Sequence, residues 1–288
     1  MKKPLVGALL SLLLLGAAAA PATAAATSRP APATAAAPAP APAVKAVDFA
    51  GTVALSNCSG SVIRMPDSQP TDPALVLSNG HCLETGFPAA GQVLVDRPST
   101  RTFSLLNAAG TKVATLRASK IAYGTMTDTD ISLYELTTTY AQIQSSYGIK
   151  ALELNAAHPT QGSAIKVVSG YWKRTYSCNV DGFVYRLKEG AWTWKDSVRY
   201  TSACQTIGGT SGSPVIDTTT GKVVAVNNTG NEDGARCTEN NPCEVAADGT
   251  VTVRQGINYA QETYGIVACV GIGNKIDLSR AGCTLPKP

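Results

Sequence analysis

Two segments of the sequence offer a base and an acid that could act in one reaction. Residues 77–82 read Leu-Ser-Asn-Gly-His-Cys and contain His81, one of only two histidines in the chain. A lone histidine is usually structural, but Cys82 follows it directly, and a disulfide there would hold the imidazole as general-base chemistry requires. Residues 127–133 place Asp130 immediately before an apolar alternation, where an acid is costly to bury unless a partner pairs with it.

A third segment, residues 207–214, reads Ile-Gly-Gly-Thr-Ser-Gly-Ser-Pro and surrounds Ser211 with glycines that let the backbone approach a substrate closely. The N–H groups of Gly209 and Ser211 could then converge and form an oxyanion hole. Other glycine-rich motifs do not fit. A phosphate-binding P-loop requires a Gly-Lys-Ser or Gly-Lys-Thr ending, and the nucleophile elbow of α/β-hydrolases requires Gly where this chain has Ser213. Both histidines precede Ser211, which excludes the residue order of that fold.

In this order, the three segments resemble those of the chymotrypsin-like serine peptidases. The Thr-Ser-Gly-Ser-Pro form of residues 210–214 is similar to that of bacterial secreted members such as the glutamyl endopeptidases, and residues 167–172 resemble the strand that opens their second barrel. The resemblance implies a catalytic triad of His81, Asp130 and Ser211 that hydrolyses peptide bonds of a peptide or protein substrate through an acyl-enzyme on Ser211. It implies no cofactor and no metal ion.

The sequence also differs from the pattern of these peptidases at several positions. Animal members carry an acid immediately before the nucleophile, which pairs with a new N-terminus after zymogen cleavage. Thr210 stands there, so we expect secretion and signal removal to suffice for activity. The substrate pocket is expected to contain Gln205, Thr206 and Asn227. Gln205 takes the place of the acid of trypsins, so the uncharged pocket should not prefer Lys or Arg. Residues 225–229, Ala-Val-Asn-Asn-Thr, correspond to the stretch in which glutamyl endopeptidases have a pocket histidine, so a preference for Glu is not expected either. Asn227 is instead a candidate hydrogen-bond partner of Asp130.

The elements that position these segments are predicted to be β-strands. After residue 45, short stretches rich in β-formers alternate with Gly, Asn, Asp and Pro turn signals, at the spacing of sandwiches or barrels. Residues 139–147 could form a helix, but no long 3.6-residue period runs through the chain. The sequence therefore predicts an all-β fold. The predicted strands are residues 60–64, 74–77, 92–95, 102–106, 112–116, 131–136, 164–168, 183–187, 214–217 and 222–226.

A polar stretch containing Pro and Gly, residues 155–163, divides the folded part into two similar halves. We therefore expect a first β-barrel over residues 45–157 and a second over residues 158–288, with a C-terminal tail pinned by Cys283. The resemblance implies that each barrel has six antiparallel strands and that the active site lies in the cleft between them. His158, in the dividing stretch, is expected to be exposed.

The N-terminal residues are predicted to lie outside this fold. Residues 1–26 begin with Lys2 and Lys3, continue with an apolar run and end near Ala-Thr-Ala, as a secretory signal peptide does. The apolar run is short for a membrane-spanning helix. Residues 27–44 are almost entirely Ala, Pro, Ser and Thr and are predicted to form an extended linker. We expect a secreted, extracellular monomer without stable membrane insertion after signal removal.

Composition argues against two further classes of site. The formal net charge is +4, but Lys2, Lys3 and Arg29 supply three of these charges and no basic run follows, so no nucleic acid is expected as a partner. The chain has no Cys-x-x-Cys pair, which disfavours zinc, and its even cysteine count indicates disulfides in an oxidising compartment. The eight cysteines are Cys58, Cys82, Cys178, Cys204, Cys237, Cys243, Cys269 and Cys283.

The disulfide pairing stays partly open. The preferred set is Cys58–Cys82, Cys237–Cys243, Cys269–Cys283 and, by what remains, Cys178–Cys204. The alternative joins Cys204 to Cys237 and Cys178 to Cys243, because four cysteines allow three pairings.

The main functional alternative is a catalytically inactive, protease-like secreted binding module. The presence of all three triad residue types argues against it, because a binding module has no need of that combination. A third class, a disulfide-rich structural envelope protein, predicts that the substitution Ser211→Ala changes nothing measurable.

Overall fold

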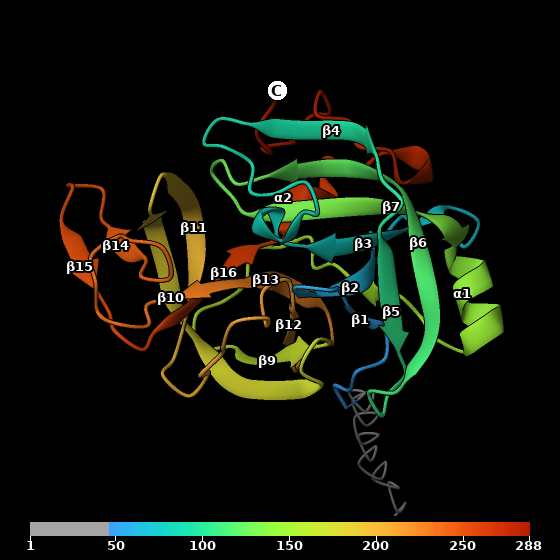
Figure 1. Cartoon of the computed structure of the whole chain (residues 1–288), viewed down its shortest axis with the longest axis horizontal. Helices are drawn as coiled ribbons and strands as arrows, with labels where there is room; N and C mark the ends of the chain where they lie inside the picture. The colour runs from blue at the N-terminus through green and yellow to red at the C-terminus, as the bar shows by residue number, and fades with distance from the viewer. Residues whose placement is uncertain (1–45) are drawn as a thin grey trace, which may run out of the picture. The chain divides into compact units, whose positions relative to one another are not determined.

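Residues 46–288, the part of the chain that the computed structural model describes, are built mainly from β-strands (Figure 1). The predicted signal peptide and linker lie outside the described residues. Each of the ten predicted strands overlaps a strand of the structure. Six strands were not predicted: β1 (Thr52–Ala54), β8 (Leu152–Glu153), β11 (Trp192–Tyr200), β14 (Cys243–Val245), β15 (Val251–Val253) and β16 (Asn258–Glu262).

The first six-stranded barrel is closed and antiparallel. Its order is β1-β5-β6-β7-β3-β2, and β2 pairs back to β1. Strand β4 (Val93–Pro98) adds to β6, and β8 (Leu152–Glu153) pairs in parallel with β2. The barrel strands are β1 (Thr52–Ala54), β2 (Ser59–Arg64), β3 (Pro73–Ser78), β5 (Thr102–Leu106), β6 (Lys112–Thr125) and β7 (Ile131–Thr139).

The second barrel repeats this plan with the order β11-β16-β13-β12-β9-β10, and β10 pairs back to β11. Strands β14 (Cys243–Val245) and β15 (Val251–Val253) extend the sheet from β10. The all-β prediction of two six-stranded antiparallel barrels is confirmed. The barrel strands are β9 (Ala164–Ser169), β10 (Arg174–Glu189), β11 (Trp192–Tyr200), β12 (Pro214–Asp217), β13 (Val223–Gly230) and β16 (Asn258–Glu262).

Alternating burial explains why these segments form barrels. Along much of β10, every second side chain is buried, as expected when one face of a strand points into a barrel. The apolar core does not stop at each barrel, because buried Leu75 and Leu77 of β3 belong to one cluster with Val168 of β9 and Val226 of β13. This shared cluster joins the two barrels, and burial of its apolar surface stabilises their contact.

Helix α1 (Tyr140–Tyr147) follows β7 directly and lies within residues 139–147, the stretch whose sequence is compatible with a helix. Thr139 is its N-cap and forms a capping box with Gln142, which satisfies two of the free backbone donors at the helix start. Gly148 ends the helix in the left-handed conformation. Side-chain chemistry therefore sets both ends of this helix.

The C-terminal tail, with α2 (Tyr264–Val267) and the 3-10 turn η2 (Ile272–Asn274), packs against the first barrel as well as the second. Cys269, Ile266 and Leu285 belong to the same buried cluster as Leu75 of β3. Ser68 donates a hydrogen bond to Asn274 at 2.7 Å, and the Tyr123 hydroxyl donates to the carbonyl of Pro286 at 2.9 Å. The chain thus returns to the first barrel after completing the second.

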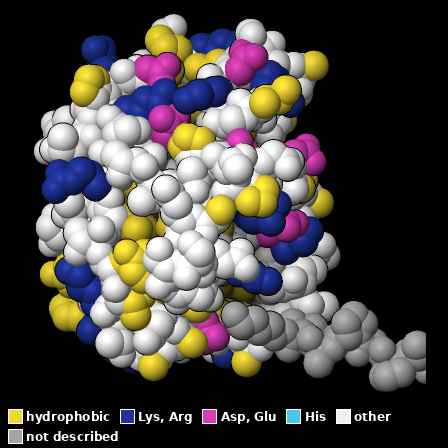
Figure 2. Space-filling model, turned by 90° about the vertical axis from the view of Figure 1, so that its right-hand side faces the viewer, with side chains coloured by type: hydrophobic (Ala, Val, Ile, Leu, Met, Phe, Trp, Pro, Cys, Tyr) yellow, Lys and Arg dark blue, Asp and Glu magenta, His cyan; other side chains and the backbone are white. Residues whose placement is uncertain are grey.

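On the face in Figure 2, acidic and basic side chains are mixed with polar and apolar ones. No helix within residues 46–288 has the length and apolar character needed to cross a membrane.

Candidate active site

His81 and Asp130 form a hydrogen-bonded pair at the edge of the first barrel. His81 lies in the 3-10 turn η1 (Gly80–Cys82), and Asp130 lies directly before β7 and is fully buried. The Nδ1 atom of His81 is 2.7 Å from Oδ2 of Asp130, and the backbone N–H of His81 donates to Oδ1 at 3.0 Å. Because an ionised carboxylate only accepts hydrogen bonds, Nδ1 carries the ring proton and Nε2 keeps a lone pair.

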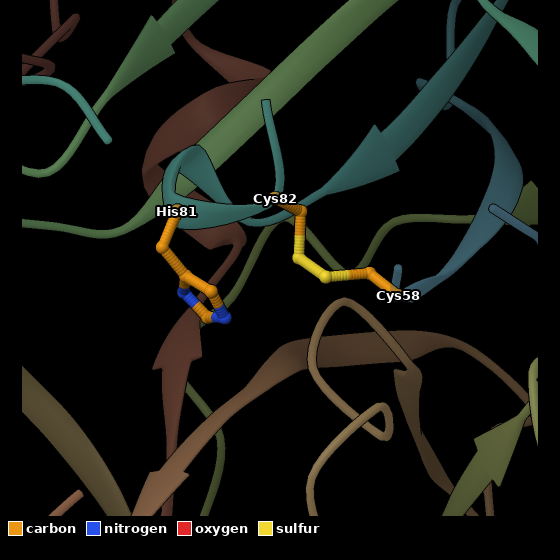
Figure 3. Close-up of side chains that lie close together, drawn as sticks. All are labelled: Cys58, His81 and Cys82. Carbon is orange, nitrogen blue, oxygen red and sulfur yellow. A yellow bond between two sulfur atoms is a disulfide. The ribbon is translucent and has the colours of Figure 1, made fainter. Parts of the chain in front are cut away.

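Hydrogen bonds and a disulfide hold this pair in place. The Asn79 amide donates to the backbone carbonyl of Asp130 at 2.8 Å, and the Ser132 hydroxyl donates to the carbonyl of Asn79 at 2.8 Å. Beyond His81, Cys82 is bonded to Cys58 (Figure 3). The His81 backbone is therefore anchored on both sides, as a positioned base requires.

The environment of His81 raises its pKa. Burial acts to lower the pKa by disfavouring the imidazolium, but the charge and hydrogen bond of Asp130, with a contribution from Glu189, outweigh burial and raise it above 6.5. Glu189, at the end of β10, is itself buried, and burial raises its pKa, although the N–H of Asn240 and the ring of His81 act in the opposite direction. The ring is thus a stronger base than a free histidine.

Ser211, in the turn before β12, lines the same pocket as His81 and Asp130. Its carbonyl accepts a hydrogen bond from the N–H of Ser59 at 2.8 Å, which ties this loop of the second barrel to β2 of the first. The Ser211 hydroxyl donates to the carbonyl of Asn228 at 3.1 Å. No hydrogen bond within residues 46–288 joins this hydroxyl to the His81 ring. Rotation about χ1 alone redirects the hydroxyl, and catalytic hydrogen bonds are often formed only when substrate binds.

The backbone before Ser211 forms a type II turn. Thr210 N–H donates to the carbonyl of Ile207 at 3.0 Å, and Gly209, the third residue of the turn, has φ +84°, which only glycine adopts readily. The indole Nε1 of Trp172 donates to the carbonyl of Gly208 at 2.7 Å. The N–H groups of Gly209 and Ser211 donate to no group within residues 46–288, so both donors are available to a ligand.

Gly212 fits where no other residue can. A Cβ atom there would lie 2.1 Å from the carbonyl oxygen of Ser59 and 2.2 Å from Oγ of Ser78, and its φ is +80°. Ser59 is the centre of this contact between the barrels. Its hydroxyl bonds with that of Ser169 at 3.0 Å and donates to the carbonyl of Gly209 at 3.2 Å.

The pocket between the barrels contains two of the three residues expected in the substrate site. Thr206 and Asn227 line it, whereas Gln205 does not. The Gln205 side chain is exposed and donates hydrogen bonds to the carbonyls of Ser202 and Gly256 at 2.8 and 3.3 Å. These bonds hold it on the surface of its loop, outside the pocket. The pocket beside Thr206 is polar, since the Thr206 hydroxyl donates to the amide oxygen of Asn258 at 2.8 Å.

The expectation that Asn227 contacts Asp130 is wrong. The amide of Asn227 accepts from the Tyr200 hydroxyl at 3.2 Å and donates to the hydroxyl of Thr210 at 3.1 Å. The Asn227 side chain is buried, and both of these partners belong to the second barrel. Thr210 in turn donates to the carbonyl of Ile207 at 2.5 Å, so its hydroxyl is fully used within the loop.

Sequence reasoning missed several residues of the pocket. The rings of Phe87 and His81 pack edge to face with their centroids 5.8 Å apart, and those of Phe87 and Trp192 do so with centroids 5.9 Å apart. The Trp192 indole donates to the carbonyl of Pro88 at 2.9 Å, which links the β10–β11 hairpin to the first barrel. Glu189 lies at the end of the same hairpin and lines the pocket. Nothing local marks these residues, because only the hairpin's extension across the cleft brings them to His81.

The disulfides of the structure are the preferred set, Cys58–Cys82, Cys178–Cys204, Cys237–Cys243 and Cys269–Cys283. Since Cys58 and Cys82 are bonded to each other, their closeness to His81 does not make a metal site. His158 is exposed, as expected, but its Nε2 lies 3.2 Å from Oδ2 of Asp196 and 3.0 Å from Oε1 of Glu262. Burial and the charge of Asp196 raise the pKa of Glu262 to about 9.

Comparisons with known proteins give one family match and several solved structures of low identity. Residues 58–226 match the family model described as the trypsin-like peptidase domain. No curated protein matches the chain significantly. Solved structures with similar folds include the active form of the Rv3671c protease from M. tuberculosis, at 16% identity and a TM-score of 0.47, with 84% of this chain and 85% of that chain covered. The protease domain of MamO from Magnetospirillum magneticum has 12% identity and a TM-score of 0.48, with 77% and 97% covered.

Proposed function

The chain belongs to the family of trypsin-like peptidase domains, and we propose that it is a secreted serine endopeptidase that hydrolyses peptide bonds through an acyl-enzyme on Ser211. The observation that carries the proposal is the His81–Asp130 pair, which shares one pocket with the Ser211 hydroxyl. Peptides and proteins are the substrates that a peptidase of this family takes.

Each residue has a role that follows from its surroundings. Nε2 of His81 has the free lone pair that accepts the Ser211 proton as the hydroxyl attacks the scissile carbonyl, and it later returns this proton to the leaving amine. Asp130 accepts from Nδ1 at 2.7 Å, which keeps the ring in the required tautomer and stabilises the imidazolium. The free N–H groups of Gly209 and Ser211 would bind the oxyanion of the tetrahedral intermediate.

The residue before Ser211 supports activity without zymogen cleavage. Animal members of the family carry an acid at this position, whereas this chain has Thr210. The Thr210 hydroxyl donates a hydrogen bond to the carbonyl of Ile207 and accepts one from the amide of Asn227. This position therefore has no charge that would need a new N-terminus as its partner.

The four disulfides support an extracellular or periplasmic location, because disulfides persist in oxidising compartments.

The expectation of an uncharged pocket is wrong, because Glu189, Glu232 and Glu239 line it. Thr206, Asn227 and Asn258 add neutral polar groups, and the first two are joined to neighbours by hydrogen bonds. The lining therefore offers both neutral and acidic groups to a substrate side chain.

Labelling with a peptidyl phosphonate tests the serine mechanism. We expect one covalent adduct on the peptide that contains Ser211, and we expect His81→Ala to abolish it because the hydroxyl then has no base. Ser213→Ala is the matched control and should keep the label, since the buried Ser213 hydroxyl donates to the carbonyl of Thr210 at 2.6 Å.

Cleavage of an internally quenched peptide with blocked ends tests the endopeptidase activity in parallel. If the folded protein takes up no label and cleaves no peptide in a mixed library, the inactive binding module is the correct description. Label on another residue would refute Ser211 as the nucleophile.

A further inference from the structure

His158, Asp196 and Glu262 converge on one point of the second barrel, away from the active-site pocket, which none of them lines. They come from three segments: the stretch between the barrels, the middle of β11 and the end of β16. Nε2 of His158 is 3.0 Å from a carboxylate oxygen of Glu262 and 3.2 Å from one of Asp196. All three ligand atoms lie within 4.8 Å of one another.

A hydrogen bond at Nδ1 of His158 determines whether Nε2 carries a proton or a lone pair. Nδ1 lies 2.7 Å from the carbonyl oxygen of Pro159, which can only accept, so Nδ1 carries the proton. In the neutral ring, Nε2 then points a lone pair at two carboxylates. Histidines that bind metals are commonly held in this way, with the second ring nitrogen donating to a backbone carbonyl.

Glu262 is the most unusual member of the cluster. Its side chain is only 6% exposed, yet neither carboxylate oxygen accepts a hydrogen bond within residues 46–288. Asp196 accepts from the Tyr264 hydroxyl at 3.3 Å. Within the same part of the chain, neither carboxylate pairs with a lysine or arginine. Apart from the nearby His158 ring and Asp196, Glu262 has no polar partner within residues 46–288, and a cation shared by the three side chains would supply one.

We propose that His158, Asp196 and Glu262 bind a divalent transition-metal ion, with Zn²⁺ as the best match to one imidazole and two carboxylates. With metal–ligand bonds of about 2.1 Å, atoms 3.0 to 3.2 Å apart subtend roughly 90 to 100° at a shared ion, which lies between octahedral and tetrahedral geometry. Calcium is a poorer match, because it prefers oxygen ligands only.

Access and position suggest what the ion does. The side chains of His158 and Asp196 are 40% and 45% exposed, so an ion can enter from solvent and keep water as a further ligand. The rings of Phe183 and Tyr264 pack against the imidazole, with centroid distances of 4.3 and 5.2 Å, and restrict its orientation. The ion would tie the connection between the barrels to two strands of the second barrel, so its role is structural and separate from peptide hydrolysis.

Calorimetric titration of Zn²⁺ into the metal-free protein, prepared without a polyhistidine tag, tests the site. We expect one ion per chain. His158→Ala should raise the Kd by more than about 100-fold, since even loss of an outer partner of a metal ligand typically costs 10- to 100-fold. His81→Ala is the matched control, because the chain has only two histidines, and it should bind Zn²⁺ like the parent protein.

Asp196→Asn and Co²⁺ supply independent measurements in case removal of His158 disturbs folding. Co²⁺ should give visible d–d absorption in the parent protein and in His81→Ala, and this absorption should be lost or shifted in Asp196→Asn. The proposal is refuted if the parent protein binds no stoichiometric Zn²⁺, or if the Kd is the same in His158→Ala. In that case the three side chains are held together by their mutual polar contacts alone.

Discussion

Replacing Trp172 with phenylalanine should slow turnover without weakening substrate binding. The indole N–H donates to the carbonyl of Gly208 at 2.7 Å. The C=O of Gly208 and the N–H of Gly209 belong to one trans peptide and point in opposite directions. The indole therefore holds the Gly209 N–H on the side away from Trp172, and phenylalanine keeps the ring packing while removing only the donor.

The size of the effect follows from the strength of this one bond. A hydrogen bond between neutral groups contributes about 0.5 to 1.5 kcal/mol net, which corresponds to roughly 2- to 12-fold. Trp172 is 49% exposed, so water competes for the Gly208 carbonyl and the upper end of this range is not expected. Complete loss of an oxyanion donor costs roughly 100- to 1000-fold. We therefore expect kcat to fall about 2- to 10-fold, with KM unchanged, because only the orientation of the donor is loosened.

Initial rates on a chromogenic peptide over a range of substrate concentrations separate kcat from KM. Trp192→Phe is the matched control. It removes an equivalent indole hydrogen bond, to the carbonyl of Pro88 at 2.9 Å, from a residue that lines the substrate pocket, so its effect should fall on KM. An unchanged kcat in Trp172→Phe, or a loss that appears only in KM, would refute the reasoning. A loss above 100-fold would show that the turn has no other support.

Three further outcomes follow from the structure. Glu189→Gln removes a charge that raises the pKa of His81, so the pKa should fall and the acid limb of the pH profile of kcat/KM should move to lower pH; an unmoved limb would contradict this. Gly212→Ala should lower the free energy of unfolding, measured by denaturant titration, by more than about 3 kcal/mol. Gly221 has a similar φ of +70° but open space around it, so Gly221→Ala should lower it by only about 1 to 2 kcal/mol. Equal losses in the two variants would contradict the steric explanation. Replacing Cys58 and Cys82 together by serine should cost about 3 to 4 kcal/mol for a bond of sequence separation 24, with a drop in kcat because the His81 turn loses its anchor, and thermal unfolding with rate measurements checks both.

Local chemistry in the sequence accounts for most of the strands and for the helix α1. Apolar alternation and turn residues act over a few positions, so β5 and β12 could be predicted with their bounds, as could the helix that Thr139 caps. The long β10 could be predicted only in part. Its alternation continues through polar residues, and its backbone pairs with three other strands, β9, β11 and β14.

The candidate site divides in the same way. The types and order of His81, Asp130 and Ser211 are visible in the sequence, since each lies in a short segment with a suitable neighbourhood. Their supports are not. Ser59 and Glu189 act through contacts that depend on how the two barrels meet, and Trp172 acts through a contact between two loops of the second barrel.

By itself, the sequence determined the fold class, the three residue types in their order and the even set of cysteines, because these depend on side-chain chemistry and on neighbours along the chain. The tertiary structure alone decided the partners of Asn227, the path of the C-terminal tail and the meeting of His158 with Glu262. Such contacts depend on strand register and barrel closure, which are set by packing across the whole domain, and no local pattern carries that information.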